Sequence, residues 1–243
     1  MSSPRDWPTE WPGPHFGPGE VHLGRLWVDH ADPQLADALT SDELDRASSF
    51  HFEVDRARYV ASRGGLRSLL ARYLGVEPRS VRLGIGSQGK PHLAGVSESD
   101  LIHFNVSHSE SLIVVGLTKD VHVGVDVEAI RDDLPHQAMA TRFFSPDELS
   151  GLNARPTEEQ LDHFYAIWTR KEAYLKGIGE GLHMSPESFS VAVEEVPSPV
   201  VHQSGSEPWW TSGVDVAEGF RAALALPQDD WKVKPFEIAD LTS

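Results

Sequence analysis

Two acidic residues in the second half of the chain have the types and spacing that metal-assisted phosphoryl chemistry needs. In Val121–Glu128 valines alternate with polar residues, so a strand would place Asp126 and Glu128 on one face. Neighbouring carboxylates repel each other unless a cation lies between them, and hard oxygen ligands suit Mg²⁺ or Mn²⁺. The same pattern is also typical of the polar outer face of an ordinary amphipathic strand, so both interpretations stay open.

A second candidate group recurs every four residues in Glu158–Lys176. Trp168, Glu172 and Lys176 would share one face of a helix there, and nearby apolar residues mark that face as largely buried. A carboxylate on such a face needs a partner. The competing interpretation is a common Glu–Lys surface pair, which stabilises a helix by only ~0.3–0.5 kcal/mol.

An arginine-rich stretch indicates where an anion would bind. The chain has a formal net charge of −16, yet residues 46–82 carry eight arginines against three acids. The arginines are Arg46, Arg56, Arg58, Arg63, Arg67, Arg72, Arg79 and Arg82. Such a local excess of positive charge favours a bound anion, although scattered arginines on a solvated helix face are equally compatible with the pattern.

Two short motifs are predicted to form turns. Asn105–Ser109 places a histidine between serines at a strand end, where it could donate to a phosphate or cap a turn. Gly89-Lys90-Pro91 is a turn with a charged tip that could meet a nucleotide or simply face water.

The order of elements repeats and predicts an α+β fold of two similar lobes in one chain. Each half is predicted as a strand, two helical segments and three strands, with the active site in the cleft between the lobes. The predicted divisions are an irregular arm at 1–20, an N-terminal lobe at 21–118 and a C-terminal lobe at 119–243. The expected strands are Val21–Asp29, Ser80–Gly84, Leu101–Val106, Ser111–Thr118, Val121–Glu128, Ser188–Val193, Trp209–Val216 and Phe220–Leu226, and the expected helices are one opening at Ser41, Val54–Leu74, Leu134–Phe144 and Glu158–Lys176.

Composition narrows the class of protein. The sequence has no cysteine, so disulfides and thiolate metal sites are excluded. The first residues lack the pattern of a secretory signal and no apolar run approaches ~20 residues, so a cytoplasmic protein without a membrane span is expected. The acidic net charge argues against broad nucleic-acid binding.

The motifs taken in order resemble the 4′-phosphopantetheinyl transferases of the surfactin-synthetase type. The matching segments are Gly89-Lys90-Pro91, Asn105–Ser109, Gly124–Glu128, Arg142-Phe143-Phe144, Trp168–Lys176 and Gly179–Leu182. The resemblance implies a pseudo-dimeric fold and a transfer of the phosphopantetheine arm of coenzyme A to a serine of an apo carrier protein, with release of adenosine 3′,5′-bisphosphate.

The resemblance also implies residue roles. Asp126, Glu128 and Glu172 would bind Mg²⁺, or Mn²⁺, and Glu172, Lys176 and His108 would be catalytic. Contacts to coenzyme A would come from Arg46, Arg58, Arg63, Lys90, Pro91, Ser107, His108 and Lys176. One position departs from the family pattern, because Glu43 stands where a lysine is expected, so the 3′-phosphate grip would rest more on Arg58 than on Arg46.

The expected partners are acyl or peptidyl carrier domains of polyketide, nonribosomal peptide or fatty acid synthases, bound by a monomer. We expect docking through apolar contacts of Phe143, Phe144 and nearby residues, aided by the arginine-rich stretch. The alternatives are a metal-dependent phosphohydrolase of a nucleotide pyrophosphate and a non-catalytic protein that binds coenzyme A or a carrier.

Overall fold

The computed structural model describes residues 7–86, 89–97, 101–179, 184–194, 196–202 and 208–238. Two long helices dominate it, α2 (Glu53–Leu74) and α5 (Thr157–Ile178). The shorter helices are α1 (Ser41–Ser48), α3 (His136–Phe143) and α4 (Pro146–Asn153), with single 3-10 turns at Val28–His30, Pro33–Ala38, Pro78–Ser80 and Pro186–Ser188. Among these residues, no helix combines the length and apolar character needed to cross a membrane.

Two four-stranded sheets form the centre of the molecule. The first has the order β12-β1-β5-β4 and the second β6-β11-β10-β8, while β2-β3 and β7-β9 are short separate ribbons. The strands are β1 (Glu20–Trp27), β2 (Leu83–Ile85), β3 (Pro91–Leu93), β4 (His103–Ser109), β5 (Leu112–Thr118), β6 (Gly124–Ala129), β7 (Phe189–Ser190), β8 (Ser198–Pro199), β9 (Val201–His202), β10 (Trp210–Val214), β11 (Phe220–Leu226) and β12 (Lys232–Glu237).

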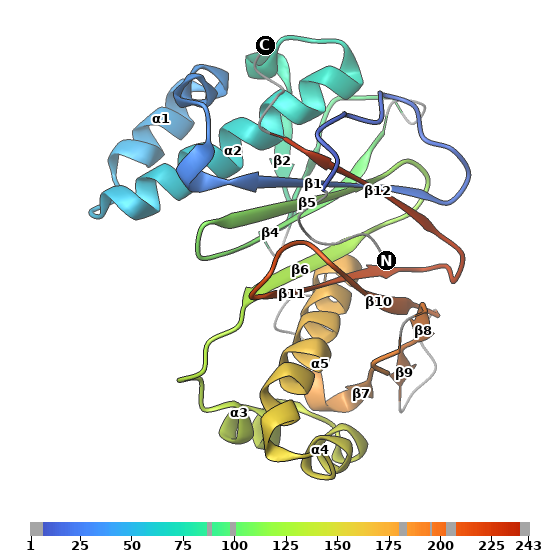
Figure 1. The fold of residues 1–243 in the computed structure, drawn as a ribbon. Helices are drawn as coiled ribbons and strands as arrows, with labels where there is room; N and C mark the ends of the chain where they lie inside the picture. Colours follow the sequence, from blue (N-terminus) through green and yellow to red (C-terminus); the bar gives the residue numbers. More distant parts are fainter. Residues whose placement is uncertain are drawn as a thin grey trace.

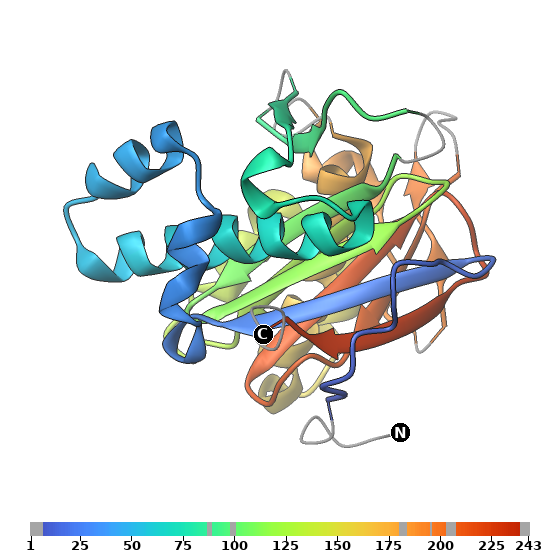
Figure 2. The ribbon, with the colours of Figure 1, turned by 90° about the horizontal axis from the view of Figure 1, so that it is seen from above.

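The sheets and long helices stack in four layers, with α2 outside the first sheet and α5 outside the second (Figure 1). Seen from above, α2 covers the first sheet and runs roughly along its strands (Figure 2). Between the two sheets lies an apolar layer that includes Val21, Val114, Val125 and Leu224, all fully buried. Because burying one such side chain contributes about 1.5–3 kcal/mol, this layer holds the two halves together.

The ends of the helices follow from local chemistry. Thr40 accepts from the Glu43 N–H while the Glu43 side chain accepts from the Thr40 N–H, a capping box that starts α1. The two long helices stop where Gly75 and Gly179 adopt φ of 65° and 73°, a left-handed conformation that glycine takes without strain. The α+β class and the two-lobed organisation expected from the sequence are confirmed.

Some elements differ from the prediction. Asn105–Ser109 is not a turn after a strand but lies inside β4, and the chain reverses at Glu110 instead. α4 and β12 were not predicted, and β12 pairs in parallel with β1 in the first sheet. The last strand thus returns to the sheet of the first half, and the predicted divisions at residues 20 and 118 stay a prediction.

Candidate functional site

Alternate side chains of β4 bind the edge of β6, where the two sheets meet. β4 and β6 are the edge strands of their sheets, and β6 would otherwise leave main-chain N–H groups unpaired. Asn105, Ser107 and Ser109 point the same way because strand side chains alternate. They accept from Val125 N–H (2.8 Å), Val127 N–H (3.3 Å) and Ala129 N–H (3.0 Å), respectively.

The two serines also support the carboxylates of β6. Ser107 Oγ donates to Asp126 Oδ1 at 2.9 Å, and Ser109 Oγ donates to Glu128 Oε2 at 2.9 Å. Each serine hydroxyl therefore accepts from one main-chain N–H of β6 and donates to the carboxylate of the preceding residue of β6. This repeated pair of contacts fixes both acidic side chains against the first sheet.

A glycine brings α5 close to the carboxylate strand. A Cβ on Gly124 would collide with the carbonyl oxygen of Ala173 and lie 2.6 Å from Gly177 N. Any other residue at Gly124 would push α5 away from β6. The close approach places Lys176 Nζ 2.6 Å from Asp126 Oδ1 and 2.9 Å from Ser107 Oγ.

Asp126 is buried and only half satisfied. Its Oδ2 atom has no hydrogen-bond partner among the described residues. Burial raises the pKa of Asp126 to about 7, with repulsion from Glu128 and Glu172 adding to it and Lys176 opposing it. The close ion pair does not overcome burial, because Lys176 satisfies one oxygen and leaves the other in an apolar environment.

The predicted metal ligands fit a hard cation in chemistry, although they form no ready ligand set. In the part of the chain that the structure describes, no three His, Asp or Glu side chains are gathered to hold a metal ion. However, the unpartnered Asp126 Oδ2 is a free oxygen ligand, and Glu128 acts to raise the pKa of Glu172 as well as that of Asp126. A divalent cation would relieve this repulsion. The ligand set of Asp126, Glu128 and Glu172 stays a prediction.

The raised pKa of Asp126 makes a prediction for the metal-free protein. The folded pKa of about 7 exceeds the ordinary value of 3.8, so folding favours the protonated form and stability falls as pH rises from about 4 to 7. Asp126→Asn cannot ionise, so its stability relative to the parent should be greater at pH 8 than at pH 5 by on the order of 2 kcal/mol. Urea unfolding with a chelator present measures this. Asp215→Asn, on the exposed surface, is the control. If the stability of Asp126→Asn relative to the parent were the same at pH 5 and pH 8, the prediction would be contradicted.

Glu43 pairs with two arginines of the arginine-rich stretch. Its carboxylate lies 2.6 Å from Arg67 Nε and 3.4 Å from Arg63 Nε. Burial acts to raise the pKa of Glu43, but Arg67, the Thr40 N–H and Arg63 outweigh it and lower the pKa. Arg67 also donates to the carbonyls of Pro78 and Val81. Two arginines of the stretch therefore pair with the acidic residue that departs from the family pattern.

Glu43→Lys, which introduces the residue type expected from the resemblance, should destabilise the protein by about 2–4 kcal/mol. The change places a third cation beside Arg63 and Arg67 and removes the capping box of α1. Chemical denaturation measures the loss. Asp45→Lys, on the exposed side of the same helix, is the control and should change stability by less than about 0.5 kcal/mol. Equal stability of the two variants would contradict this account.

The remaining predicted arginines lie nearer to the carboxylate strand or at the surface. Arg58 Nε donates at 3.0 Å to the carbonyl of Glu110, which lies in the turn that follows Ser109. The Nη1 atom of Arg58 lies 3.3 Å from Asp55 Oδ1. Arg46 is exposed and lies over the ring of Phe50.

His108 belongs to the same end of β4. It is exposed to solvent, yet local desolvation lowers the pKa of its imidazole, and the cations Arg58 and Lys176 add to the effect. A neutral ring near pH 7 can donate from one nitrogen and accept at the other. The structure thus brings His108 to the Arg58 end of the site, and its role stays a prediction.

Lys90 and Pro91 lie at the opposite end of the junction. They line a cavity of about 210 Å³ together with His103, His122 and Gly177. The Lys90 side chain does not point to water; its ammonium donates to main-chain carbonyls at the end of α5.

The residues of the Trp168–Lys176 segment on α5 have different surroundings. Lys171 is buried and donates to both oxygens of Glu148 at 2.9 and 2.7 Å, so it supports the packing of α4 against α5. The expected docking role of Phe144 is wrong, because this ring is 4% exposed and stacks on Phe164. Phe143 is partly exposed and packs edge-on against Trp168. Gly181 and Leu182 lie outside the described residues.

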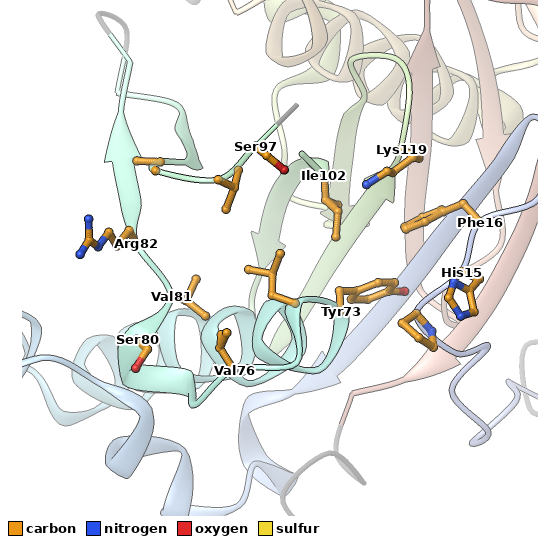
Figure 3. Close-up of a pocket in the computed structure, with 15 residues that line it drawn as sticks. His15, Phe16, Tyr73, Val76, Ser80, Val81, Arg82, Ser97, Ile102 and Lys119 are labelled. Atoms are coloured by element: carbon orange, nitrogen blue, oxygen red, sulfur yellow. The ribbon is translucent and has the colours of Figure 1, made fainter. Parts of the chain in front are cut away.

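A larger cavity of about 700 Å³ lies away from these groups. Figure 3 shows it between the end of α2, the N-terminal arm and the approach to β2, with Tyr73, Phe16 and Ile102 along its wall. Arg82 of the arginine-rich stretch lines it, but none of the residues to which the resemblance assigns a role is among the described residues of its wall. We therefore take the β4–β6–α5 junction as the candidate site.

Comparison with known proteins identifies the family of the chain. Residues 122–225 match the profile of the 4′-phosphopantetheinyl transferase superfamily, and residues 30–119 match that of the 4′-phosphopantetheinyl transferase N-terminal region. The chain is 43% identical over 167 residues to the 4′-phosphopantetheinyl transferase HetI of Nostoc sp. PCC 7120, covering 67% of this chain and 70% of the relative. It is 27% identical over 212 residues to a 4′-phosphopantetheinyl transferase of Bacillus subtilis and 24% identical to Sfp of strain 168, each covering 87% of this chain and 92% of the relative.

Proposed function

Because this chain belongs to the 4′-phosphopantetheinyl transferase family, we propose that it transfers the phosphopantetheine arm of coenzyme A to a serine of an acyl or peptidyl carrier protein. The serine oxygen forms a bond to the β-phosphorus of coenzyme A. The bond from that phosphorus to the bridging oxygen breaks, and adenosine 3′,5′-bisphosphate leaves with the electron pair. The serine proton passes to a base.

One observation carries the proposal. A buried carboxylate with one unpartnered oxygen, Asp126, pairs through its other oxygen with Lys176 of α5, the helix that packs against β6. A protein that only binds a nucleotide has no need to keep such a costly arrangement, because an incompletely paired buried charge destabilises the fold. Phosphoryl transfer does need it, since charge must be offset on the attacked and leaving oxygens.

The chain's own residues divide the work. Lys176 neutralises the leaving phosphate, and its present partners Asp126 and Ser107 hold it at the junction. His108 and Ser107 contact the phosphates. The 3′-phosphate binds at Arg58 and Arg46, whereas the charge of Arg63 is largely offset by Glu43.

Mg²⁺, or Mn²⁺, bound by Asp126, Glu128 and Glu172 would supply Lewis-acid stabilisation of the phosphate oxygens. Glu172 is the carboxylate that we assign as proton acceptor. Without a bound cation, burial raises the pKa of Glu172, against the effect of Lys176 and with that of Glu128. Glu172 would accept the proton directly or through a water. Pro91 lines the small cavity beside the junction, which suits the adenine end of coenzyme A.

The surfactin-synthetase subtype, the cytoplasmic location, the monomeric state and the carriers of polyketide, nonribosomal peptide or fatty acid synthases belong to the same proposal. Identity to HetI is higher than identity to Sfp, so a test panel should contain carriers of several pathways.

The decisive experiment incubates the protein with coenzyme A, Mg²⁺ and a panel of apo carriers and weighs each carrier by mass spectrometry. We expect a gain by the mass of one phosphopantetheine arm on at least one carrier, and equimolar adenosine 3′,5′-bisphosphate. A carrier whose acceptor serine is replaced by alanine is the control. Release of free 4′-phosphopantetheine without carrier modification would indicate the hydrolase, and no turnover at all would indicate a binding protein; either result overturns the proposal.

A further inference from the structure

Lys90 reaches from the first half of the chain to the end of the helix that carries Lys176. Its Nζ donates to the carbonyls of Lys176 at 2.6 Å, Gly177 at 3.1 Å and Val123 at 3.3 Å. An ammonium group has three hydrogens to donate, so these three contacts can satisfy it. One of the acceptors is the main chain of Lys176 itself.

The contact supplies what the end of α5 lacks. The last four carbonyls of a helix have no partner within the helix, and a cation there is also favoured by the helix dipole. Gly179 ends α5, and a Cβ at Gly179 would lie 3.9 Å from Lys90 Cδ, so the lysine stem runs along the helix end. Lys90 is therefore a helix cap delivered from another part of the chain.

The main chain of Lys90 is also fixed, by the β2–β3 ribbon. It immediately precedes β3, and its carbonyl accepts from the Gly86 N–H at 2.9 Å across the β2–β3 ribbon. The third acceptor, Val123, lies just before β6, so one ammonium joins the ribbon, α5 and the start of the carboxylate strand. Burial lowers the pKa of Lys90 to about 8, which agrees with a side chain withdrawn from water.

We propose that Lys90 is a positioning residue that fixes the C-terminal turn of α5, and thereby Lys176 against Asp126, and that its ammonium does not contact the nucleotide. The proposal rests on the proposed function, because Lys176 assists a leaving phosphate only if phosphopantetheine is transferred. It replaces the nucleotide contact that the family resemblance implies for this lysine.

The first test needs no substrate. Lys90→Met keeps the stem and removes the charge, so hydrogen exchange of the Gly177, Ile178 and Gly179 amides should become at least about tenfold faster. Lys232→Met, an exposed lysine on β12, is the control and should leave these amides unchanged. Equal exchange in the parent and in Lys90→Met would overturn the cap.

The second test uses transfer kinetics. Lys90→Met should lower kcat about tenfold or more while the KM for coenzyme A stays within about threefold, and Lys90→Arg, which keeps a cation, should recover most of kcat. In a Lys176→Ala background the same Lys90→Met change should cost less than about threefold, because the residue that it positions is gone. A tenfold rise in KM with kcat preserved, or the full loss of kcat repeated in the Lys176→Ala background, would overturn the proposal.

The two failures can be told apart. If Lys176→Ala retains full transfer, the role of Lys176 in the proposed function fails while hydrogen exchange still reports the cap. If Lys90→Met does not fold, the exchange and kinetics of Lys90→Arg decide: slow exchange with kcat near that of the parent supports the cap. Fast exchange and a low kcat in Lys90→Arg, together with weaker binding of adenosine 3′,5′-bisphosphate, contradict the cap.

Discussion

Glu128→Gln should lower kcat for phosphopantetheine transfer by about 10²–10³-fold while the fold stays intact. The substitution keeps a side-chain oxygen to accept from Ser109 Oγ, so the junction of the two sheets is preserved. It removes one negative charge from the group that would hold the cation, and loss of one such preorganised charge typically costs about 10²–10³-fold in rate. Carrier mass gain with time, at saturating coenzyme A and Mg²⁺, measures the effect.

The matched control for this variant is Glu218→Gln, an exposed glutamate in the turn between β10 and β11. Its rate should stay within about twofold of the parent, because surface substitutions away from special contacts have small effects. The variant Ser109→Ala keeps the Glu128 charge but removes the support of its carboxylate. If Glu128→Gln were as active as the control, the assignment of the carboxylate strand would be wrong.

Glu148→Ala should destabilise the protein by about 3–5 kcal/mol. Glu148 is buried and accepts from Lys171 Nζ, from the Val191 N–H at 2.8 Å and from the Ser145 N–H at 2.8 Å. Removing it leaves the Lys171 ammonium, which is 1% exposed, without its charged partner. Breaking one side of a buried ion pair is among the most costly single changes. Urea denaturation followed by fluorescence measures the loss.

The double variant Glu148→Gln/Lys171→Met separates charge burial from lost packing. The two main-chain N–H groups bond to different oxygens of Glu148, so the single side-chain oxygen of glutamine can accept from one of them. Methionine fills the space of the lysine stem without a charge. We expect the double variant to recover at least half of the stability that Glu148→Ala loses, because neither substituted group carries an unpaired charge. A double variant as unstable as Glu148→Ala would show that packing rather than charge is at stake.

The sequence predicted the elements whose signals are local. The glycines at 75 and 179 mark the ends of the two long helices, and the alternation of valines with polar residues identifies the carboxylate strand. β12 was missed because its sequence alternates lysine with apolar residues around Pro235, a residue that weakens any strand assignment. Only its pairing with β1, at the far end of the chain, makes it a strand.

Contacts that join distant segments could not be derived from either segment alone. From the sequence, Glu43 was only a departure from the family pattern, whereas in the structure it pairs with Arg63 and Arg67. Lys90 was predicted at the tip of a turn, whereas its ammonium donates to the carbonyl of Lys176. The position of Ser109 on a strand could have been predicted from the sequence. Asn105, Ser107 and Ser109 repeat with a period of two, which is the period of a strand and not of a turn.

That period of two has a consequence for how the protein acquires activity. A shift of β4 by one residue would turn Val106 and His108 toward β6 and withdraw both serines from Asp126 and Glu128 at once. The correct docking of the halves and the assembly of the carboxylate pair are therefore a single event. A misregistered molecule could keep its secondary structure and still be inert, so refolding yields measured by transfer should fall below those measured by circular dichroism.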